Sequence, residues 1–221
     1  MYRSVIINNI DTPVFIYLTA QGMPSGAQEV LKALTDVKEK FSLVEVKVDD
    51  WFSAFSPWTS EPVARGQKAF EGKGKDTLED IFSSIIPFVT KEFPENEGVY
   101  LCGYSLAGLF SLWALYEDKD MIFDGAVCCS PSLWYPGWGE YEAEHQLGGR
   151  KSIYLSLGDK EANTKNRVMC EVANAIKRTK QRLEADDNCV ASTLVMNPGG
   201  HFEDSIGRIV LGIKWVLALK T

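Results

Sequence analysis

Short apolar segments alternate with segments of helical spacing along this chain, and that alternation constrains the fold more than any other feature. Residues 14–18 and 98–102 are apolar without a polar face, as expected of strands buried on both sides of a parallel sheet. Further strand-like segments of similar length lie at 2–7, 43–48, 125–129, 152–157 and 192–196.

Helical patterns fill the intervals between these strands. In 165–186 the apolar stripe recurs through Val168, Val172, Ile176 and Leu183. Other helices are expected at 27–41, 77–92 (bent or interrupted at Pro87), 107–116 and 205–219. The alternation predicts the α/β class, with a mostly parallel central sheet and helices on both faces. A chain of 221 residues, 45% of them hydrophobic and with no linker, is expected to form one domain over 1–221.

Two long segments, 49–75 and 130–151, fit neither pattern and are interpreted as lid-like loops. Both follow strands, so they should emerge at the carboxyl edge of the sheet, where ligands bind in this class. They carry Trp51, Trp58 and Trp134. These aromatic residues either attach irregular loops to the domain or form the wall of a substrate pocket, and the sequence allows both.

A nucleophile motif lies between a buried strand and a helix. Residues 103–107 read Gly-Tyr-Ser-Leu-Ala, a G-x-S-x-G arrangement with alanine in the last place. A strand that turns directly into a helix exposes the central residue at the sheet edge in a strained conformation. Ser105 is therefore the candidate nucleophile, and the N–H of Leu106, at the helix N-terminus, is a candidate oxyanion donor.

The candidate base is one of only two histidines in the chain. His201 follows the last strand and precedes the last helix, and a tight Pro-Gly-Gly turn leads into it. A base must come within about 2.6–3.2 Å of the hydroxyl that it deprotonates. We expect the loop to bring His201 back over Ser105.

The candidate acid should follow the strand at 152–157, because this fold places its triad in the order serine, acid, histidine. The loop there contains both Asp159 and Glu161. Many hydrolases of this shape carry the acid three residues after a glycine that ends the strand, which favours Glu161. Asp159 remains the second choice.

The composition narrows the possible partners. A net charge of −7 without a basic patch argues against binding to nucleic acid or to an anionic membrane surface. The five cysteines are an odd number, whereas a disulfide framework usually has an even count, so none is expected. They form no CxxC pair, so no metal site is expected either. With no apolar segment of about 20 residues and no signal-peptide core, the chain is expected to be cytoplasmic. The oligomeric state is left open.

Four motifs together resemble the esterase branch of the α/β-hydrolases, which includes esterase D-like, feruloyl and siderophore esterases. They are GYSLAGLFSLWAL at 103–115, SPSLWY at 130–135, LGDKE at 157–161 and NPGGHF at 197–202. The resemblance implies hydrolysis of a small-molecule carboxylic ester through an acyl-enzyme, with no cofactor. It also implies that Ser132 and Trp134 line the pocket.

The loop after the strand at 14–18 departs from this pattern. Hydrolases of this shape often have His-Gly-X there, with the N–H of X as the second oxyanion donor. This chain has Gln21-Gly22-Met23, so Met23 is the candidate and Gln21 replaces the histidine. An acyltransferase or a thioesterase could use the same triad, and a non-catalytic binding protein could keep the fold. These remain the alternatives to a serine esterase.

Overall fold

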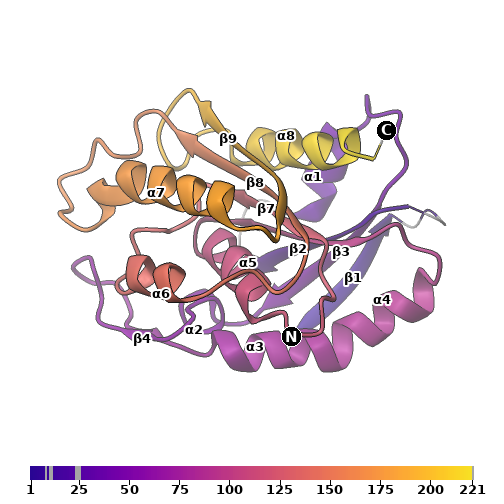
Figure 1. Cartoon of the computed structure of the whole chain (residues 1–221), viewed down its shortest axis with the longest axis horizontal. Coiled ribbons are helices and arrows are strands. Elements are labelled where there is room, and N and C mark those ends of the chain that lie inside the picture. Colours follow the sequence, from indigo (N-terminus) through magenta and orange to yellow (C-terminus); the bar gives the residue numbers. More distant parts are fainter. Residues whose placement is uncertain (8, 10–11, 23–25, 221) are drawn as a thin grey trace.

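The computed structural model describes residues 1–7, 9, 12–22 and 26–220, and a seven-stranded sheet forms its centre (Figure 1). The strands lie in the order β1-β3-β2-β6-β7-β8-β9, and all neighbours are parallel except β1 and β3. Their bounds are β1 Tyr2–Ile7, β2 Val14–Ala20, β3 Ser42–Val48, β6 Val99–Tyr104, β7 Gly125–Cys129, β8 Lys151–Gly158 and β9 Cys189–Asn197. The predicted mostly parallel sheet is confirmed.

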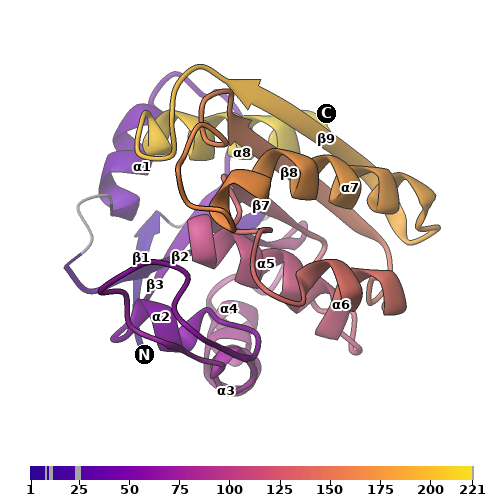
Figure 2. The same ribbon diagram turned by 90° about the vertical axis from the view of Figure 1, so that its left-hand side faces the viewer.

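Helices cover both faces of the sheet, as Figure 2 shows. One face carries α1 (Ala27–Ala33) and α8 (Ser205–Ala218), which pack against each other. The other carries α5 (Ser105–Glu117) and α7 (Val172–Ala185). Each face has its own apolar core, and the buried residues of α5 and α7 belong to one while those of α1 and α8 belong to the other. The predicted α/β-hydrolase architecture is therefore present.

Two of the predicted helices differ most from the observed ones. The helix expected over 27–41 ends at Ala33, before Thr35 and Asp36, residue types that favour turns over helix interiors. The helix expected from residue 165 begins as a short 3₁₀ turn, Met169–Glu171, because the Asn166 side chain accepts hydrogen bonds from the N–H groups of Val168 and Met169 and forms a turn first.

Around Pro87 the chain remains helical. The helix runs through α3 (Gly74–Asp80), the π-helical η1 (Ile81–Ile85) and α4 (Ile86–Glu92). A proline cannot donate its backbone N–H inside a helix, and a π-turn is one way to absorb that loss. The expected interruption is thus a wider turn just before the proline.

Both segments predicted as lid-like loops contain regular structure that is anchored in the core. Segment 49–75 folds into α2 (Trp51–Ala54) and a hairpin of β4 (Thr59–Ser60) and β5 (Phe70–Glu71). Segment 130–151 contains α6 (Trp138–Glu144). Trp138 is fully buried, and Glu142 accepts hydrogen bonds from Arg178 and Thr179 of α7, so α6 is held against α7.

No helix within the described residues combines the length and the apolar character that crossing a membrane requires.

Candidate active site

Ser105 occupies the sharp turn between β6 and α5. Its backbone lies in the left-handed region, with φ of 55°, which costs a residue other than glycine of order 1–3 kcal/mol. Strain of this kind is maintained only where the surrounding structure enforces it, and it is common at catalytic turns. The turn presents the hydroxyl at the carboxyl edge of the sheet.

Small residues on either side make this turn possible. A Cβ at Gly103 would lie 2.2 Å from the carbonyl oxygen of Ala107, so the strand and the helix approach too closely for any side chain there. Gly108 is also confined, because a Cβ would lie 3.1 to 3.2 Å from the backbone of Gly103, Cys129 and Pro131. The G-x-S-x-A-G pattern is therefore a packing requirement of the turn.

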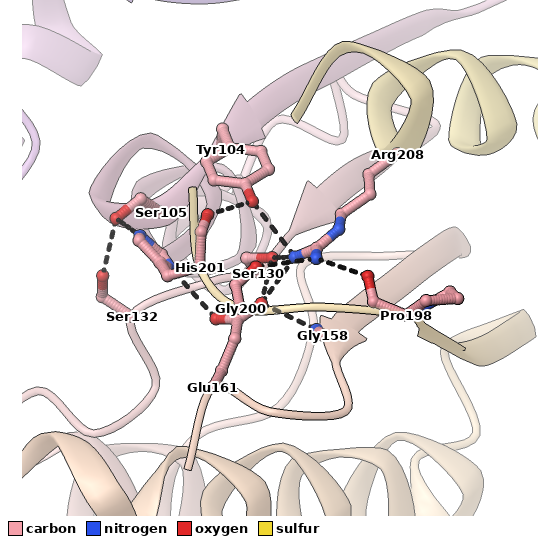
Figure 3. A network of polar contacts seen from close by, with 10 residues as sticks. All are labelled: Tyr104, Ser105, Ser130, Ser132, Gly158, Glu161, Pro198, Gly200, His201 and Arg208. Atoms are coloured by element: carbon pink, nitrogen blue, oxygen red, sulfur yellow. Dashed lines mark hydrogen bonds and ion pairs between the residues drawn. The ribbon is translucent and has the colours of Figure 1, made fainter. Parts of the chain in front are cut away.

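Three predicted side chains meet at this edge, as Figure 3 shows. Nε2 of His201 lies 2.9 Å from Oγ of Ser105, and Nδ1 of the same ring lies 2.8 Å from Oε2 of Glu161. This arrangement fits the tautomer in which Nδ1 donates to the carboxylate and Nε2 accepts from the hydroxyl. The hydroxyl of Ser132 lies 3.3 Å from that of Ser105.

Asp159, the second choice for the acid, lies elsewhere in the same loop. Its Oδ1 accepts a hydrogen bond from the backbone N–H of Gly199 at 2.8 Å, which ties the end of β8 to the turn before His201. Of the two loop carboxylates, it is Glu161 that reaches the imidazole.

Glu161 is almost fully buried, with 3% of its side chain exposed, yet it is surrounded by donors. Burial raises the pKa of Glu161, but hydrogen bonds from His201, Ser130 and the N–H of Gly158, together with the attraction of the His201 ring, outweigh burial and lower it. The carboxyl group is therefore held as a carboxylate facing the imidazole.

Three residues that the sequence did not single out complete this network. Arg208 of α8 donates to Oε1 of Glu161 at 2.6 Å, and Ser130 donates to the same oxygen at 2.7 Å. The phenol of Tyr104 donates to the carbonyl of His201 at 2.6 Å, and burial raises the pKa of Tyr104 to about 12. An arginine within the apolar helix SIGRIVLGI was the available signal for Arg208.

Of the two predicted oxyanion donors, one can be located. Leu106 is the second residue of α5 and lines the cavity beside Ser105, and the first N–H groups of a helix have no intrahelical partner. Met23 lies outside the described residues. Gln21, which precedes it, donates through its side-chain amide to Asp49 at 2.9 Å.

A cavity of about 860 Å³ opens over Ser105, with a lining that is mainly apolar. Pocket roles were considered for Trp51, Trp58, Ser132 and Trp134, and three of these four, Trp51, Ser132 and Trp134, line the cavity. Phe70 and Met169 line it as well. Ligand sites of about 300–1,000 Å³ with few polar groups are typical of small-molecule pockets. Trp51, Phe70 and Trp134 of the two long segments thus form a pocket wall.

Trp58 corrects this prediction, because it does not line the cavity. Its Nε1 donates to the carbonyl of Pro136, and its ring packs against Tyr135 and Tyr141. Trp58 therefore attaches one long segment to the other. The attachment and pocket interpretations both hold, for different tryptophans.

Nowhere in the described part of the chain do three histidine, cysteine, aspartate or glutamate side chains gather as a metal ion would require.

A comparison with known protein families finds one match that covers most of the chain. The family described as "Putative esterase" matches residues 28–203, which include Ser105, Glu161 and His201. No curated protein sequence matches the chain.

Solved structures share the fold at low sequence identity. The siderophore hydrolase EstA from Aspergillus nidulans is 17% identical with a TM-score of 0.70, over 96% of this chain and 84% of EstA. An IroE-like serine hydrolase from Shewanella oneidensis is 16% identical with a TM-score of 0.77, over 94% and 71%. The enterobactin esterase from Shigella flexneri is 17% identical with a TM-score of 0.62; 93% of this chain aligns with 53% of that one.

Proposed function

Because the chain belongs to the Putative esterase family, we propose that it is a serine hydrolase that cleaves small carboxylic esters through an acyl-enzyme on Ser105. The observation that carries the proposal is the continuous path of hydrogen bonds from Oγ of Ser105 through both nitrogens of His201 to Glu161. Such a path joins a nucleophile, a base and an orienting acid.

The chemistry follows from these contacts. Nε2 of His201 takes the hydroxyl proton as Oγ of Ser105 bonds to the ester carbonyl carbon, and the carbonyl oxygen becomes an oxyanion. His201 then gives that proton to the departing alkoxide, leaving the acyl group on Ser105. Water then gives a proton to the same nitrogen as its oxygen bonds to the acyl carbon. The bond from that carbon to Oγ of Ser105 breaks, His201 returns the proton to Oγ, and the carboxylic acid is released. Every proton in this scheme comes from the Ser105 hydroxyl or from water, and His201 transfers it.

Two backbone N–H groups are proposed to stabilise the developing charge. The N–H of Leu106 points from the start of α5, where the helix dipole stabilises negative charge. The backbone N–H of Met23 is proposed as the second donor. Each such donor contributes roughly 10²–10³ in rate in hydrolases of this kind.

The cavity indicates the substrate class. Its aromatic wall and its volume of about 860 Å³ suit an ester with a bulky or flat apolar acyl group. The names of two structural neighbours, a siderophore hydrolase and an enterobactin esterase, agree with a small-molecule ester. We propose this class for the present chain.

A fluorophosphonate probe and a series of nitrophenyl esters test the proposal. The wild-type protein should form one covalent adduct on Ser105 and turn over esters, and Ser105→Ala should lose the adduct and roughly 10⁵-fold or more in kcat. Ser111→Ala is the matched control, because Ser111 lies on the same helix and its hydroxyl donates to the carbonyl of Ala107 rather than to a triad residue. A protein that stays unlabelled while binding ligands would instead be a non-catalytic member of the fold.

A further inference from the structure

Arg208 is a charged residue buried beside the proposed triad. It lies near the start of α8, and 1% of its side chain is exposed. Burial of a guanidinium is unfavourable unless its donors are paired. The groups that pair with the Arg208 guanidinium therefore indicate what this residue holds in place.

One end of the guanidinium binds the acid. Nη1 lies 2.6 Å from Oε1 of Glu161, 2.7 Å from the hydroxyl of Ser130 and 3.1 Å from that of Tyr104. Ser130 in turn donates to the same Glu161 oxygen. The oxygen of Glu161 that does not face His201 is thus fixed by charged and neutral donors together.

The other end binds the loop that carries the base. Nη2 donates to the carbonyl of Gly200 at 2.8 Å and reaches that of Pro198 at 3.4 Å. Tyr104, a partner of Nη1, donates to the carbonyl of His201 itself at 2.6 Å. One planar group therefore contacts both the loop after β8 and the loop after β9 (Figure 3).

We propose that Arg208 is a positioning residue that holds the carboxylate of Glu161 and the ring of His201 in the relative positions that proton transfer requires. This inference rests on the proposed function, because the relative positions of Glu161 and His201 matter only if the triad is catalytic. Arginine suits the task since its donors lie in one rigid plane and can bridge two loops, whereas a lysine ammonium is a point charge on a flexible stem.

An electrostatic role would act in the opposite direction. A cation 2.6 Å from Glu161 weakens the attraction of that carboxylate for a protonated His201. If charge alone mattered, removing Arg208 would help the base accept its proton. A misplacement of about 1 Å at a reacting group can cost about 10²-fold in rate. We therefore expect the misplacement of Glu161 and His201 to outweigh the easier protonation of His201.

The first test compares Arg208→Lys and Arg208→Met with wild type on a nitrophenyl ester. Rates are expressed per reactive Ser105 counted with the fluorophosphonate, so that an unstable preparation still gives a value. We expect kcat to fall about 10- to 100-fold in both variants, with KM within about twofold. Arg182→Met of α7 is the matched control, since Arg182 also forms an ion pair with a buried glutamate, Glu142, and does not line the cavity. The kcat of this control should remain that of wild type. Wild-type kcat in Arg208→Lys and Arg208→Met would overturn the proposal.

The second test needs neither turnover nor a stable variant. In wild type, proton NMR should show a downfield signal from Nδ1–H of His201, and the held guanidinium of Arg208 should give separate Nη1 and Nη2 signals. A single averaged Nη signal would overturn the proposal even if no Arg208 variant folds. If wild type lacks esterase activity while both NMR signatures are present, the proposed function fails and the positioning contact stands; activity without these signatures gives the reverse result.

Discussion

Glu161 and His201 face each other across 2.8 Å, from Oε2 of the carboxylate to Nδ1 of the imidazole. Asp159, two residues earlier, is instead engaged by the backbone of Gly199. The two carboxylates of one loop thus have separate partners, and amide substitutions can tell them apart.

We expect Glu161→Gln to lower kcat by about 10⁴-fold, because the amide can donate to Nδ1 and hold the ring in the wrong tautomer. Asp159→Asn should stay close to wild type, since its amide oxygen can still accept from Gly199. Steady-state kinetics on a nitrophenyl ester provide the measurement. Equal losses in both variants would contradict the assignment of Glu161.

The lowered pKa of Glu161 also predicts how stability depends on pH. A carboxyl whose pKa is lower in the folded state than the ordinary value of 4.5 stabilises that state above this pH. The contribution is lost as the pH falls through the folded-state pKa, because the protonated group no longer favours the native site. The difference in unfolding free energy between wild type and Glu161→Gln should therefore be larger at pH 7 than at pH 3.5. Urea denaturation at the two pH values measures it, and an unchanged difference would contradict the prediction.

The turn at Ser105 should not tolerate a methyl group at Gly103. A Cβ there would lie 2.2 Å from the carbonyl oxygen of Ala107, so Gly103→Ala must separate β6 from α5. We expect a loss of stability of about 3 kcal/mol or more and loss of activity. Gly66→Ala is the control, because Gly66 has φ of 79° with nothing within 4 Å of the added Cβ, and it should cost about 1 kcal/mol from strain alone. Thermal unfolding and ester turnover of the two variants test whether Gly103→Ala loses more stability and activity than Gly66→Ala.

Trp134 and Trp58 separate pocket contact from attachment. Trp134 lines the cavity, so Trp134→Ala should raise KM most for esters with large acyl groups. Trp58 lies outside the cavity and bonds to Pro136, so Trp58→Ala should lower the unfolding temperature without changing the order of preferred esters. A chain-length series on both variants, with their melting curves, provides the readout. A change of preference in Trp58→Ala alone would reverse the two roles.

The strands could be predicted because burial on both faces leaves an unambiguous pattern. The apolar segment 14–18 lies within β2, and 98–102 overlaps β6. The helix ends were less predictable, because they depend on side-chain turns such as the one at Asn166 rather than on the apolar stripe. The π-turn before Pro87 likewise has no periodic signal.

The residues of the site were likewise predictable where the signal is local and not where it depends on distant contacts. Ser105 and His201 belong to short motifs with their own turn geometry, so local sequence was enough to nominate them. Glu161 and Asp159 stand two residues apart. The spacing from the glycine that ends the strand favoured Glu161, but which carboxylate faces the ring depends on the curvature of the loop. Arg208 was missed because an arginine near a helix start is usually solvated, and its burial depends on the distant residues Tyr104, Ser130 and Glu161.

The anchoring of α6 has a consequence for how esters would reach Ser105. Trp138 is buried, and Arg178 and Thr179 bind Glu142, so α6, which follows the cavity-lining Trp134 in sequence, is part of the folded core rather than a flap. Within the described residues, an ester hydrolase with α6 anchored in this way has no flap at that helix for an oil–water boundary to draw aside. Its turnover should therefore rise smoothly with dissolved ester and show no jump when the ester begins to form micelles.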